Sequence, residues 1–530
     1  MRSAHGDSFV RDRLPPPEAQ PEFLFDLPEL RYPERLNAAI ELIDRTPADS
    51  LALVNDAGTW TYGDMRVLSD RIARLLVEEE GLVPGNRVLL RGPNGAMLFA
   101  AWLGVLKAGG ILVTTMPLLR AGELATLIAR AQVHHAIVDE RCLDDFRTAA
   151  DETGLIRSLL TYRGDVGGGA LETRLERVQA GFPAADTHRD DVAMIAFTSG
   201  TTGQPKGCVH YHRDILASAD SFARHILRPG PGDRWACSAP IAFTFGLGMS
   251  LVFPWRFGGT AITVEQPSPK ALLEAIARHR VTTLATAPTA YKAMLAMVPE
   301  HDTAALRTCV SAGEHLPAAT WQAWHDATGI RIVDGIGATE MMHIFISASG
   351  DAIRPGATGR AVPGYKACVL APDGEPLLHA PGRLAVKGPT GCRYFDDPRQ
   401  SAYVENGWNL TGDTYREDED GYFWYVARSD DMIVSSGYNI AAPEVENALY
   451  AHPAVLECAV IGVPCEERGQ RVKAFVVPAP GHDPGAALAR ALQDHVKATI
   501  APYKYPRDVE FVAALPKTAT GKLQRFALRP

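Results

Sequence analysis

Short apolar runs alternate with helical segments through most of the chain, and this alternation constrains the fold more strongly than any other feature of the sequence. The runs at residues 51–54 and 87–90 have the length of buried strands, and residues 61–76 between them have the pattern of a helix. The same succession recurs through residues 260–333. Strand, helix, strand units of this length predict a mostly parallel, right-handed sheet that is covered by helices.

The length and the changes of pattern along the chain predict several packed units. A chain of 530 residues is too long for one ordinary core. Residues 1–30, which contain three consecutive prolines, are expected to form an extended arm. Residues 31–429 are expected to form a large N-terminal domain, with a small β subdomain from about 367 to 429, and residues 430–530 a small α/β C-terminal domain. The predicted fold class is therefore α/β.

Composition excludes several classes of function. The net charge of -9 and the pI near 6.0 provide no basic surface for nucleic acid. The longest apolar run, residues 239–253, contains glycines and is followed by Pro254, so it is too short to cross a membrane. The eight cysteines form no CxxC pair and no secretory signal is visible, which indicates a cytoplasmic protein with reduced thiols. The oligomeric state, monomer or homodimer, is left open.

Residues 198–207 (TSGTTGQPKG) have the composition of a polyphosphate-binding loop. They follow the apolar run 192–197, which reads as a buried strand. Glycines let backbone N–H groups turn toward an anion, hydroxyls donate hydrogen bonds, and a lysine supplies a positive charge. The residues that provide these features are Thr198, Ser199, Gly200, Thr201, Thr202, Gly203, Lys206 and Gly207.

The spacing within this loop differs from that of a Walker-type loop. A Walker loop requires Gly, four residues and then Gly-Lys-Ser/Thr. Here Gly207 follows Lys206, so the Ser or Thr hydroxyl that binds magnesium in a Walker loop is absent. A phosphate-loop kinase, or a catalytically silent nucleotide sensor, therefore remains as an alternative of another class.

Four further motifs follow the loop in order: DGIGATE at 334–340, TGD at 411–413, RSDDMI at 428–433 and PKTATGK at 516–522. Together with the loop they resemble the signature motifs of the adenylate-forming superfamily, which contains acyl-CoA synthetases, adenylation domains of peptide synthetases and luciferases. The resemblance covers nearly the whole chain. It implies that a carboxylate attacks the α-phosphate of ATP to form an acyl-adenylate and pyrophosphate.

The resemblance also implies roles for individual residues. Glu340 is expected to hold Mg²⁺ on the phosphates, Thr339 to donate to the α-phosphate, and Lys206 to steady the leaving phosphates. Lys522 is expected to bridge the substrate carboxylate and the α-phosphate. The residues expected around the adenosine are Asp413 and Arg428 at the ribose and Gly313 and Glu314 at the adenine, and the further expected nucleotide contacts are Asp334, Gly335, Ile336 and Gly337.

A second half-reaction is implied by the small C-terminal domain. In the family this domain is mobile and swings about a hinge aspartate, here Asp430, so that Lys522 leaves and the strand with Ser436 and Gly437 approaches the adenylate. Small residues there leave room for a pantetheine arm. The thiol comes from coenzyme A or from a carrier protein, so none of the cysteines is needed as a nucleophile.

Three stretches indicate the acid. Residues 243–248 (FTFGLG), 334–345 and 516–526 resemble aryl-CoA ligases that act on benzoate and 2-aminobenzoate, and residues 242–248 and 434–440 resemble the 2-aminobenzoate (anthranilate) branch most. A flat aromatic acid needs apolar walls and one or two polar groups. The candidate walls are Phe243, Phe245, Ile336 and Gly337, and the candidate polar contacts are Thr244 and His343. In the alternative interpretation, the two phenylalanines belong to the core and His343 is a satisfied helix histidine.

The sequence thus predicts an aryl-CoA ligase that uses ATP, Mg²⁺ and coenzyme A and releases AMP and pyrophosphate. Direct loading of a carrier protein is the alternative within the same chemistry. A nucleic acid or membrane partner is not expected.

Overall fold

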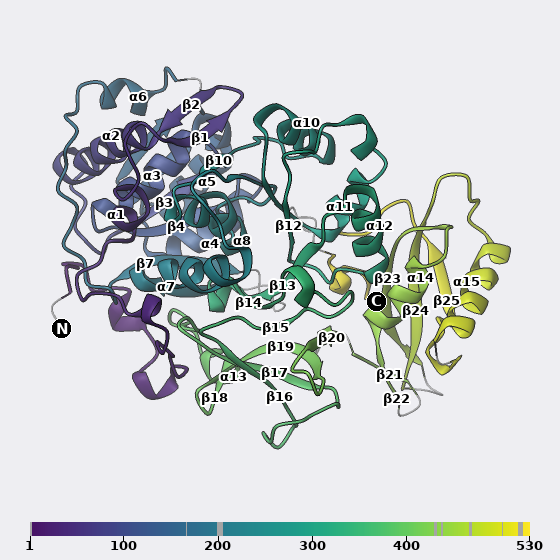
Figure 1. Cartoon of the computed structure of the whole chain (residues 1–530). Coiled ribbons are helices and arrows are strands. Elements are labelled where there is room, and N and C mark those ends of the chain that lie inside the picture. Colours follow the sequence, from purple (N-terminus) through teal and green to yellow (C-terminus); the bar gives the residue numbers. More distant parts are fainter. Residues whose placement is uncertain are drawn as a thin grey trace.

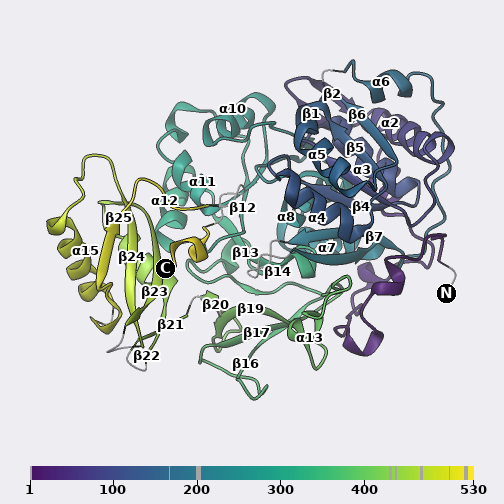
Figure 2. The same cartoon turned by 180° about the vertical axis from the view of Figure 1, so that it is seen from behind.

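The computed structural model describes residues 3–165, 167–198, 205–428, 432–435, 438–465, 469–500, 502–517 and 523–529. Two large sheets and their helices form one side of the molecule (Figure 1). A smaller antiparallel sheet lies below them in this view, and the C-terminal sheet with its helices lies at the opposite side, which Figure 2 shows from behind. This is the α/β architecture that the sequence predicts.

A six-stranded sheet carries the two strands that flank the candidate phosphate loop. Its order is β6-β5-β3-β4-β7-β8, and β8 at one edge runs antiparallel to β7 while the other pairs are parallel. Its strands are β3 (Arg87–Arg91), β4 (Ile111–Thr115), β5 (His135–Asp139), β6 (Ser158–Tyr162), β7 (Val192–Thr198) and β8 (Lys206–Tyr211).

A nine-stranded sheet, ordered β15-β14-β13-β12-β11-β9-β10-β1-β2, carries the DGIGATE segment. The six strands from β13 to β1 in this order are parallel, and β2, β14 and β15 are antiparallel to their neighbours. Its strands are β1 (Leu51–Asn55), β2 (Gly58–Thr61), β9 (Arg234–Cys237), β10 (Thr260–Ile262), β11 (Thr283–Thr286), β12 (Thr308–Ser311), β13 (Ile332–Gly337), β14 (Ile344–Ser347) and β15 (Arg360–Ala361).

Helices cover both sheets, as the alternating pattern predicts. Thr61 caps α2 in a capping box with Asp64, which explains why the helix begins there. Every residue of α3 is buried, and Trp102 of α3 shares one core with Leu53 of β1 and Leu90 of β3. The helices are α1 (Ala38–Ile43), α2 (Tyr62–Arg74), α3 (Ala96–Lys107), α4 (Ala121–Ala131), α5 (Leu143–Thr153), α6 (Ala170–Leu175), α7 (His212–Ser218), α8 (Thr244–Leu247), α9 (Phe253–Arg256), α10 (Pro269–His279), α11 (Pro288–Met294) and α12 (Ala318–Thr328).

The chain beyond β15 forms two smaller sheets. The first is antiparallel, in the order β16-β17-β19-β18 with β20 paired to β19, and the second has a separate hydrophobic core with α14 and α15. Among the residues that the structure describes, no helix is long and apolar enough to cross a membrane. The elements are β16 (Lys366–Leu370), β17 (Gly382–Lys387), α13 (Gln400–Tyr403), β18 (Val404–Glu405), β19 (Trp408–Glu417), β20 (Phe423–Arg428), β21 (Met432–Ser435), β22 (Tyr438–Ala441), α14 (Ala442–Tyr450), β23 (Val455–Cys465), β24 (Gly469–Pro478), α15 (Ala486–Thr499) and β25 (Asp508–Phe511).

The N-terminal arm lies along the large domain. Its described residues contain short 3-10 turns and neither an α-helix nor a strand. Asp7 pairs with the buried Arg87, Val10 belongs to a core cluster with Leu89, and the backbone N–H of Leu24 donates to the carbonyl of Gly388 at 2.9 Å. The domain boundaries at residues 30, 367 and 430 stay predictions.

A buried ion pair joins α7 to the segment that precedes α13. Arg393 donates to the carboxylate of Asp214 at 2.7 Å, and both side chains are completely buried. The guanidinium of Arg393 also lies 4.1 Å from the ring centre of Phe23 and 4.0 Å from that of Tyr211. Breaking such a pair leaves an uncompensated charge in the core.

We therefore expect Asp214→Asn to lower the free energy of unfolding by about 3–5 kcal/mol. Urea unfolding followed by tryptophan fluorescence measures this change. Lys270→Ala, which removes an exposed pair with Glu274 at 3.7 Å, is the matched control and should cost about 0–1 kcal/mol. Equal effects of the two substitutions would contradict a stabilising role for the buried pair.

Candidate active site

A chain of polar contacts connects three segments that are far apart in the sequence. Lys206, the first residue of β8, lies with its Nζ 3.1 Å from the hydroxyl of Tyr394, and that hydroxyl donates to Oε1 of Glu340. The Lys206 Nζ also lies 5.0 Å from the centre of the Tyr394 ring. The lysine of the loop and the carboxylate of the DGIGATE motif are therefore brought to one place through a tyrosine.

The hairpin of β7 and β8 positions the loop. Thr198 at the end of β7 is the register partner of Lys206 at the start of β8, so the loop begins and ends between these two residues. The segment around Tyr394 runs beside β8, with the backbone N–H of Phe395 donating to the carbonyl of Gly207 at 2.8 Å. Lys206 thus lies where the loop, β8 and the Tyr394 segment meet.

The turn after β13 positions Thr339 and Glu340. The strand ends at Gly337, and residues Thr339–Met341 form a 3-10 turn. His210 of β8 contacts the carbonyl of Thr339 at 2.8 Å, and Thr390 donates to the carbonyl of Met341 at 2.7 Å. This turn is therefore held from both sides, and Glu340 is buried within it.

Burial and the nearby Glu340 charge raise the pKa of Tyr394, so its hydroxyl keeps the proton that it donates. Glu340 fits a magnesium ion of the kind that keeps waters and substrate phosphates as its other ligands, because such sites need one or two carboxylates. Within the ranges that the structure describes, no three His, Cys, Asp or Glu side chains form a metal cluster.

The predicted adenosine contacts lie at the ends of neighbouring strands. The parallel strands β12 and β13 end at Ser311 and Gly337, which places the turns after them at one edge of the sheet. Gly313 in the first turn has a φ of +91°, a conformation that favours glycine, and it is exposed beside the half-buried Glu314. Gly335 approaches Ile344 so closely that a Cβ would lie 2.7 Å from Cγ2 of that side chain.

Asp413 and Arg428 are partners in the pairing of β19 with β20. Asp413 is buried, and its backbone N–H lies 3.3 Å from the Thr411 hydroxyl that accepts from it. The predicted ribose residues are thus neighbours in space, although the side chain of Arg428 lies outside the described part of the structure.

Three phenylalanines surround His343. Its ring stacks on those of Phe222 and Phe245, with centroids 5.4 Å and 5.7 Å away, and meets Phe253 edge-on at 4.5 Å. A Cβ on Gly248 would lie 2.4 Å from Cδ2 of His343, so the ring needs a glycine at that position. His343 precedes β14 in a turn and lies outside any helix.

His343 is a buried, neutral histidine. Burial lowers its pKa to about 3, and the backbone of Phe245 opposes that shift. Neither ring nitrogen has a partner with hydrogen-bond geometry within the described residues. A buried polar group without a partner is a candidate for contact with a ligand. Thr244 in α8 is buried, whereas Phe243, Phe245 and Ile336 are half-buried and Gly337 is exposed.

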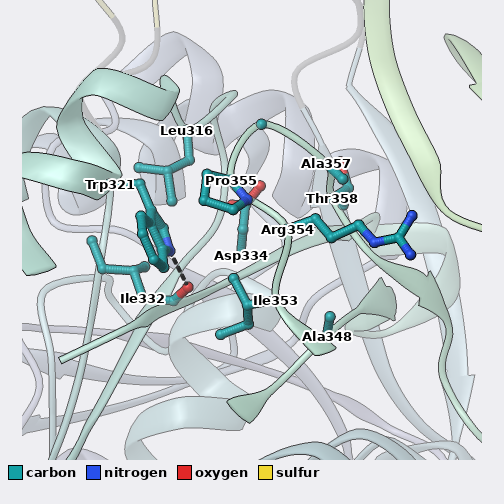
Figure 3. Close-up of a pocket in the computed structure, with 11 residues that line it drawn as sticks. Leu316, Trp321, Ile332, Asp334, Ala348, Ile353, Arg354, Pro355, Ala357 and Thr358 are labelled. Carbon is teal, nitrogen blue, oxygen red and sulfur yellow. Dashed lines mark hydrogen bonds between the residues drawn. The ribbon is translucent and has the colours of Figure 1, made fainter. Parts of the chain in front are cut away.

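Asp334 lies in β13 and lines a small cavity together with Pro355 and Thr358, as Figure 3 shows. The cavity has a volume of about 10 Å³, which is room for about one water molecule and not for an aromatic acid. On its far wall, Nε1 of Trp321 donates to the carbonyl of Ile332 at 3.0 Å.

The sequence matches the family described as AMP-binding enzyme over residues 41–394, and the family described as AMP-binding enzyme C-terminal domain over residues 444–522. The chain belongs to the AMP-binding enzymes. These matches confirm the membership of the adenylate-forming superfamily that the motifs predict.

Several CoA ligases of aromatic acids are similar to this AMP-binding enzyme in sequence and in structure. A benzoate--CoA ligase of Thauera aromatica is 38% identical over 513 residues, which are 95% of this chain and 97% of the relative. The crystal structure of the anthranilate CoA ligase AuaEII in complex with anthranoyl-AMP superimposes with a TM-score of 0.90 at 34% identity, over 95% of this chain and 98% of that one. A benzoate CoA ligase from Burkholderia xenovorans LB400 gives a TM-score of 0.86 at 34% identity, over 93% and 100%. These similarities do not favour a kinase or a silent nucleotide sensor.

Part of the predicted site lies outside the described residues. This holds for the loop positions, for the hinge, for the two small residues of the predicted thiol tunnel and for the terminal lysine: Ser199, Gly200, Thr201, Thr202, Gly203, Asp430, Ser436, Gly437 and Lys522. Their roles stay predictions.

Tyr394 was missed by reasoning from the sequence. It lies between β17 and α13, 54 residues from Glu340 and 188 from Lys206, and no local spacing connects the three. Phe222 and Phe253 were missed for the same reason, because the contact with His343 becomes visible only when the sheets are assembled.

The carboxyl group of Asp334 provides a test of how deeply the end of β13 is buried. Its Oδ1 is fully covered and has no partner among the described residues, although part of the residue is exposed. Burial raises its pKa from 3.8 to about 8, and the backbone of Gly335 opposes that shift. Between these two values the folded enzyme holds a proton that the unfolded chain has lost, so stability falls as the pH rises.

We expect Asp334→Asn to remove this dependence. The melting temperature of the variant should rise relative to that of the unchanged enzyme as the pH increases from 4 toward 8, because asparagine cannot ionise. Differential scanning fluorimetry without nucleotide measures it, and Asp351→Asn on the exposed surface is the control. A difference in melting temperature that stays constant with pH would contradict the raised pKa.

Proposed function

We propose that this enzyme is an AMP-forming aryl-CoA ligase whose acid is benzoate or 2-aminobenzoate. One observation carries the proposal: a single short turn places Glu340 where the hydroxyl of Tyr394 connects it to Lys206, and three residues later His343 lies among three phenylalanines. A phosphate-binding end and an aromatic end therefore lie next to each other. The similarity to CoA ligases of benzoate and anthranilate over nearly the whole chain supports it.

In the first step an oxygen of the acid's carboxylate forms a bond to the α-phosphorus of ATP. The bond from that phosphorus to the bridging oxygen breaks, and pyrophosphate leaves with the electron pair. Both reactants are anions, so positive charge and hydrogen-bond donors must surround the reacting oxygens. Lys206 and the loop hold the leaving phosphates, and Thr339 donates to the α-phosphate. A magnesium ion held by Glu340 and the phosphates would neutralise the charge of the nucleotide.

The edge of the nine-stranded sheet and the smaller antiparallel sheet together hold the nucleoside. Asp413 accepts from the ribose hydroxyls, and Arg428, its register partner, reaches the same sugar. Gly313 and Glu314 line one side of the adenine, and the residues from Asp334 to Gly337 line the other. The exposed backbone at Gly313, where an added Cβ would meet no atom within 4 Å, leaves room for a flat base.

In the second step the sulfur of coenzyme A forms a bond to the acyl carbon. The bond between that carbon and the phosphate oxygen breaks, AMP leaves, and the thiol proton is released. Lys522 serves the first step, and a swing about Asp430 brings Ser436 and Gly437 to the adenylate for the second. The eight cysteines are free thiols, and none of them is needed in either step.

The pocket for the acid has apolar walls from Phe243, Phe245, Ile336 and Gly337. Thr244 and His343 are its polar contacts. A neutral imidazole has one donor and one acceptor nitrogen, so His343 can accept from an amino group at the ring or donate to a hydroxyl. We propose that the enzyme acts in the cytoplasm, as a monomer or a homodimer. The acyl group is accepted by the thiol of coenzyme A.

A panel of acids tests the proposed function. With Mg-ATP and coenzyme A, we expect benzoate and 2-aminobenzoate to release AMP and pyrophosphate with kcat/KM values about tenfold or more above those of acetate and of a long-chain fatty acid. The physical reason is that a flat ring fills aromatic walls that short and flexible chains leave partly empty. Quantification of AMP, ADP and the acyl product measures this.

Two controls separate the alternatives. Replacing coenzyme A by a pantetheinylated carrier protein should abolish thioester formation while the adenylate still forms. Release of ADP, or preference for acetate or a fatty acid, would contradict the proposal.

A further inference from the structure

We propose that Tyr394 is a positioning residue that fixes the Glu340 carboxylate and the Lys206 ammonium at a set separation, and thereby prepares the site for metal-bound nucleotide. The inference deepens the proposed function and rests on it for the identity of the reaction. The inference is based on the two hydrogen bonds that the Tyr394 hydroxyl makes.

The directions of the two hydrogen bonds follow from the chemistry of the groups. A protonated lysine can only donate, so the Tyr394 oxygen accepts from Lys206 across 3.1 Å. A carboxylate can only accept, so the single proton of the hydroxyl goes to Oε1 of Glu340. The Tyr394 hydroxyl is thus both an acceptor, from Lys206, and a donor, to Glu340, and these two hydrogen bonds fix its orientation.

The ring that carries this hydroxyl is held by its surroundings. Tyr394 is buried, its backbone N–H donates to Oε1 of Gln400 at 2.8 Å, and its ring meets that of Tyr403 at a centroid distance of 5.7 Å. Gln400 in turn donates to the carbonyl of Cys392 at 3.1 Å. A group held in this way keeps its position when ligands enter and leave, which is the requirement for preorganisation.

The hydroxyl also keeps two opposite charges apart. Lys206 and Glu340 carry opposite charges and attract each other. In a direct ion pair, the ammonium would lie against the carboxylate that is expected to hold the metal cation. With Tyr394 between them, Oε2 of Glu340 makes no hydrogen bond to any described residue and remains available. The neutral hydroxyl takes one oxygen of Glu340 and one proton of Lys206, and it keeps the ammonium out of direct contact with the carboxylate.

Tyr394→Phe in the full-length enzyme removes the hydroxyl and retains the ring. We expect the magnesium concentration that half-saturates acid-dependent exchange of pyrophosphate into ATP to rise about tenfold, and the exchange rate to fall about tenfold or more, because a hydrogen bond to a charged group is lost. Thioester formation from supplied benzoyl-adenylate and coenzyme A should stay within about twofold, since the phosphates that Lys206 and Glu340 hold have already left.

Tyr403→Phe is the matched control. Its hydroxyl is buried in the same cluster and has no partner among the described residues, so its loss should leave both half-reactions and the magnesium dependence unchanged. The two variants should melt within a few degrees of each other. If Tyr394→Phe fails to fold, or slows both half-reactions equally, Tyr394 is a packing residue and the inference is overturned.

A binding measurement separates this inference from the proposed function. Electron paramagnetic resonance of Mn²⁺ with ATP, without any acid, reports the metal-nucleotide complex directly. We expect Tyr394→Phe to weaken that complex about tenfold relative to Tyr403→Phe. Equal binding by the two variants would overturn the role of Tyr394. Absence of exchange with every aromatic acid in the unchanged enzyme would instead overturn the proposed acid.

Discussion

The contact between β8 and the segment at residues 392–395 is the interaction on which the rest of the site depends. Three consecutive side chains of that segment each make a different contact. Cys392 joins a buried cluster with Cys208, Arg393 pairs with Asp214 of α7, and Tyr394 connects Lys206 to Glu340. Displacement of this segment would therefore expose a buried charge and separate the two groups that are proposed to hold the phosphates.

This contact also joins the two large sheets to the smaller antiparallel one. β8 is the edge strand of the six-stranded sheet, and the Glu340 turn follows β13 of the nine-stranded sheet. The segment at 392–395 leads from β17 toward α13 of the smaller sheet. The site is therefore built where three sheets meet, with Lys206 at the start of β8, Glu340 in the turn after β13, and Tyr394 in the segment between β17 and α13.

Much of the architecture was predictable because it follows from local pattern. The apolar runs became β1 and β3, and the capping box of Thr61 and Asp64 begins α2 where the sequence indicates a helix. The motifs placed Lys206, Glu340 and Asp413 in the candidate site because glycines, hydroxyls and charges recur there at fixed spacings.

The remainder of the site depends on contacts between distant segments. Tyr394 and Phe222 look like ordinary core residues in the sequence, and only the assembled sheets bring them to Glu340 and His343. The space beside Gly248 is equally invisible in the sequence, because a glycine in an apolar run has no local reason to face a histidine. The parts of the site on the terminal lysine loop and the hinge stay predictions from the motifs.

This enzyme activates a carboxylate by joining one of its oxygens to the α-phosphorus of ATP. Benzoate labelled with ¹⁸O in its carboxylate tests this directly when the AMP formed with coenzyme A is analysed by mass spectrometry. We expect one ¹⁸O atom in the phosphate of each AMP, because the bond that breaks in the second step leaves that oxygen on phosphorus. Unlabelled AMP, or label in ADP or inorganic phosphate, would contradict it.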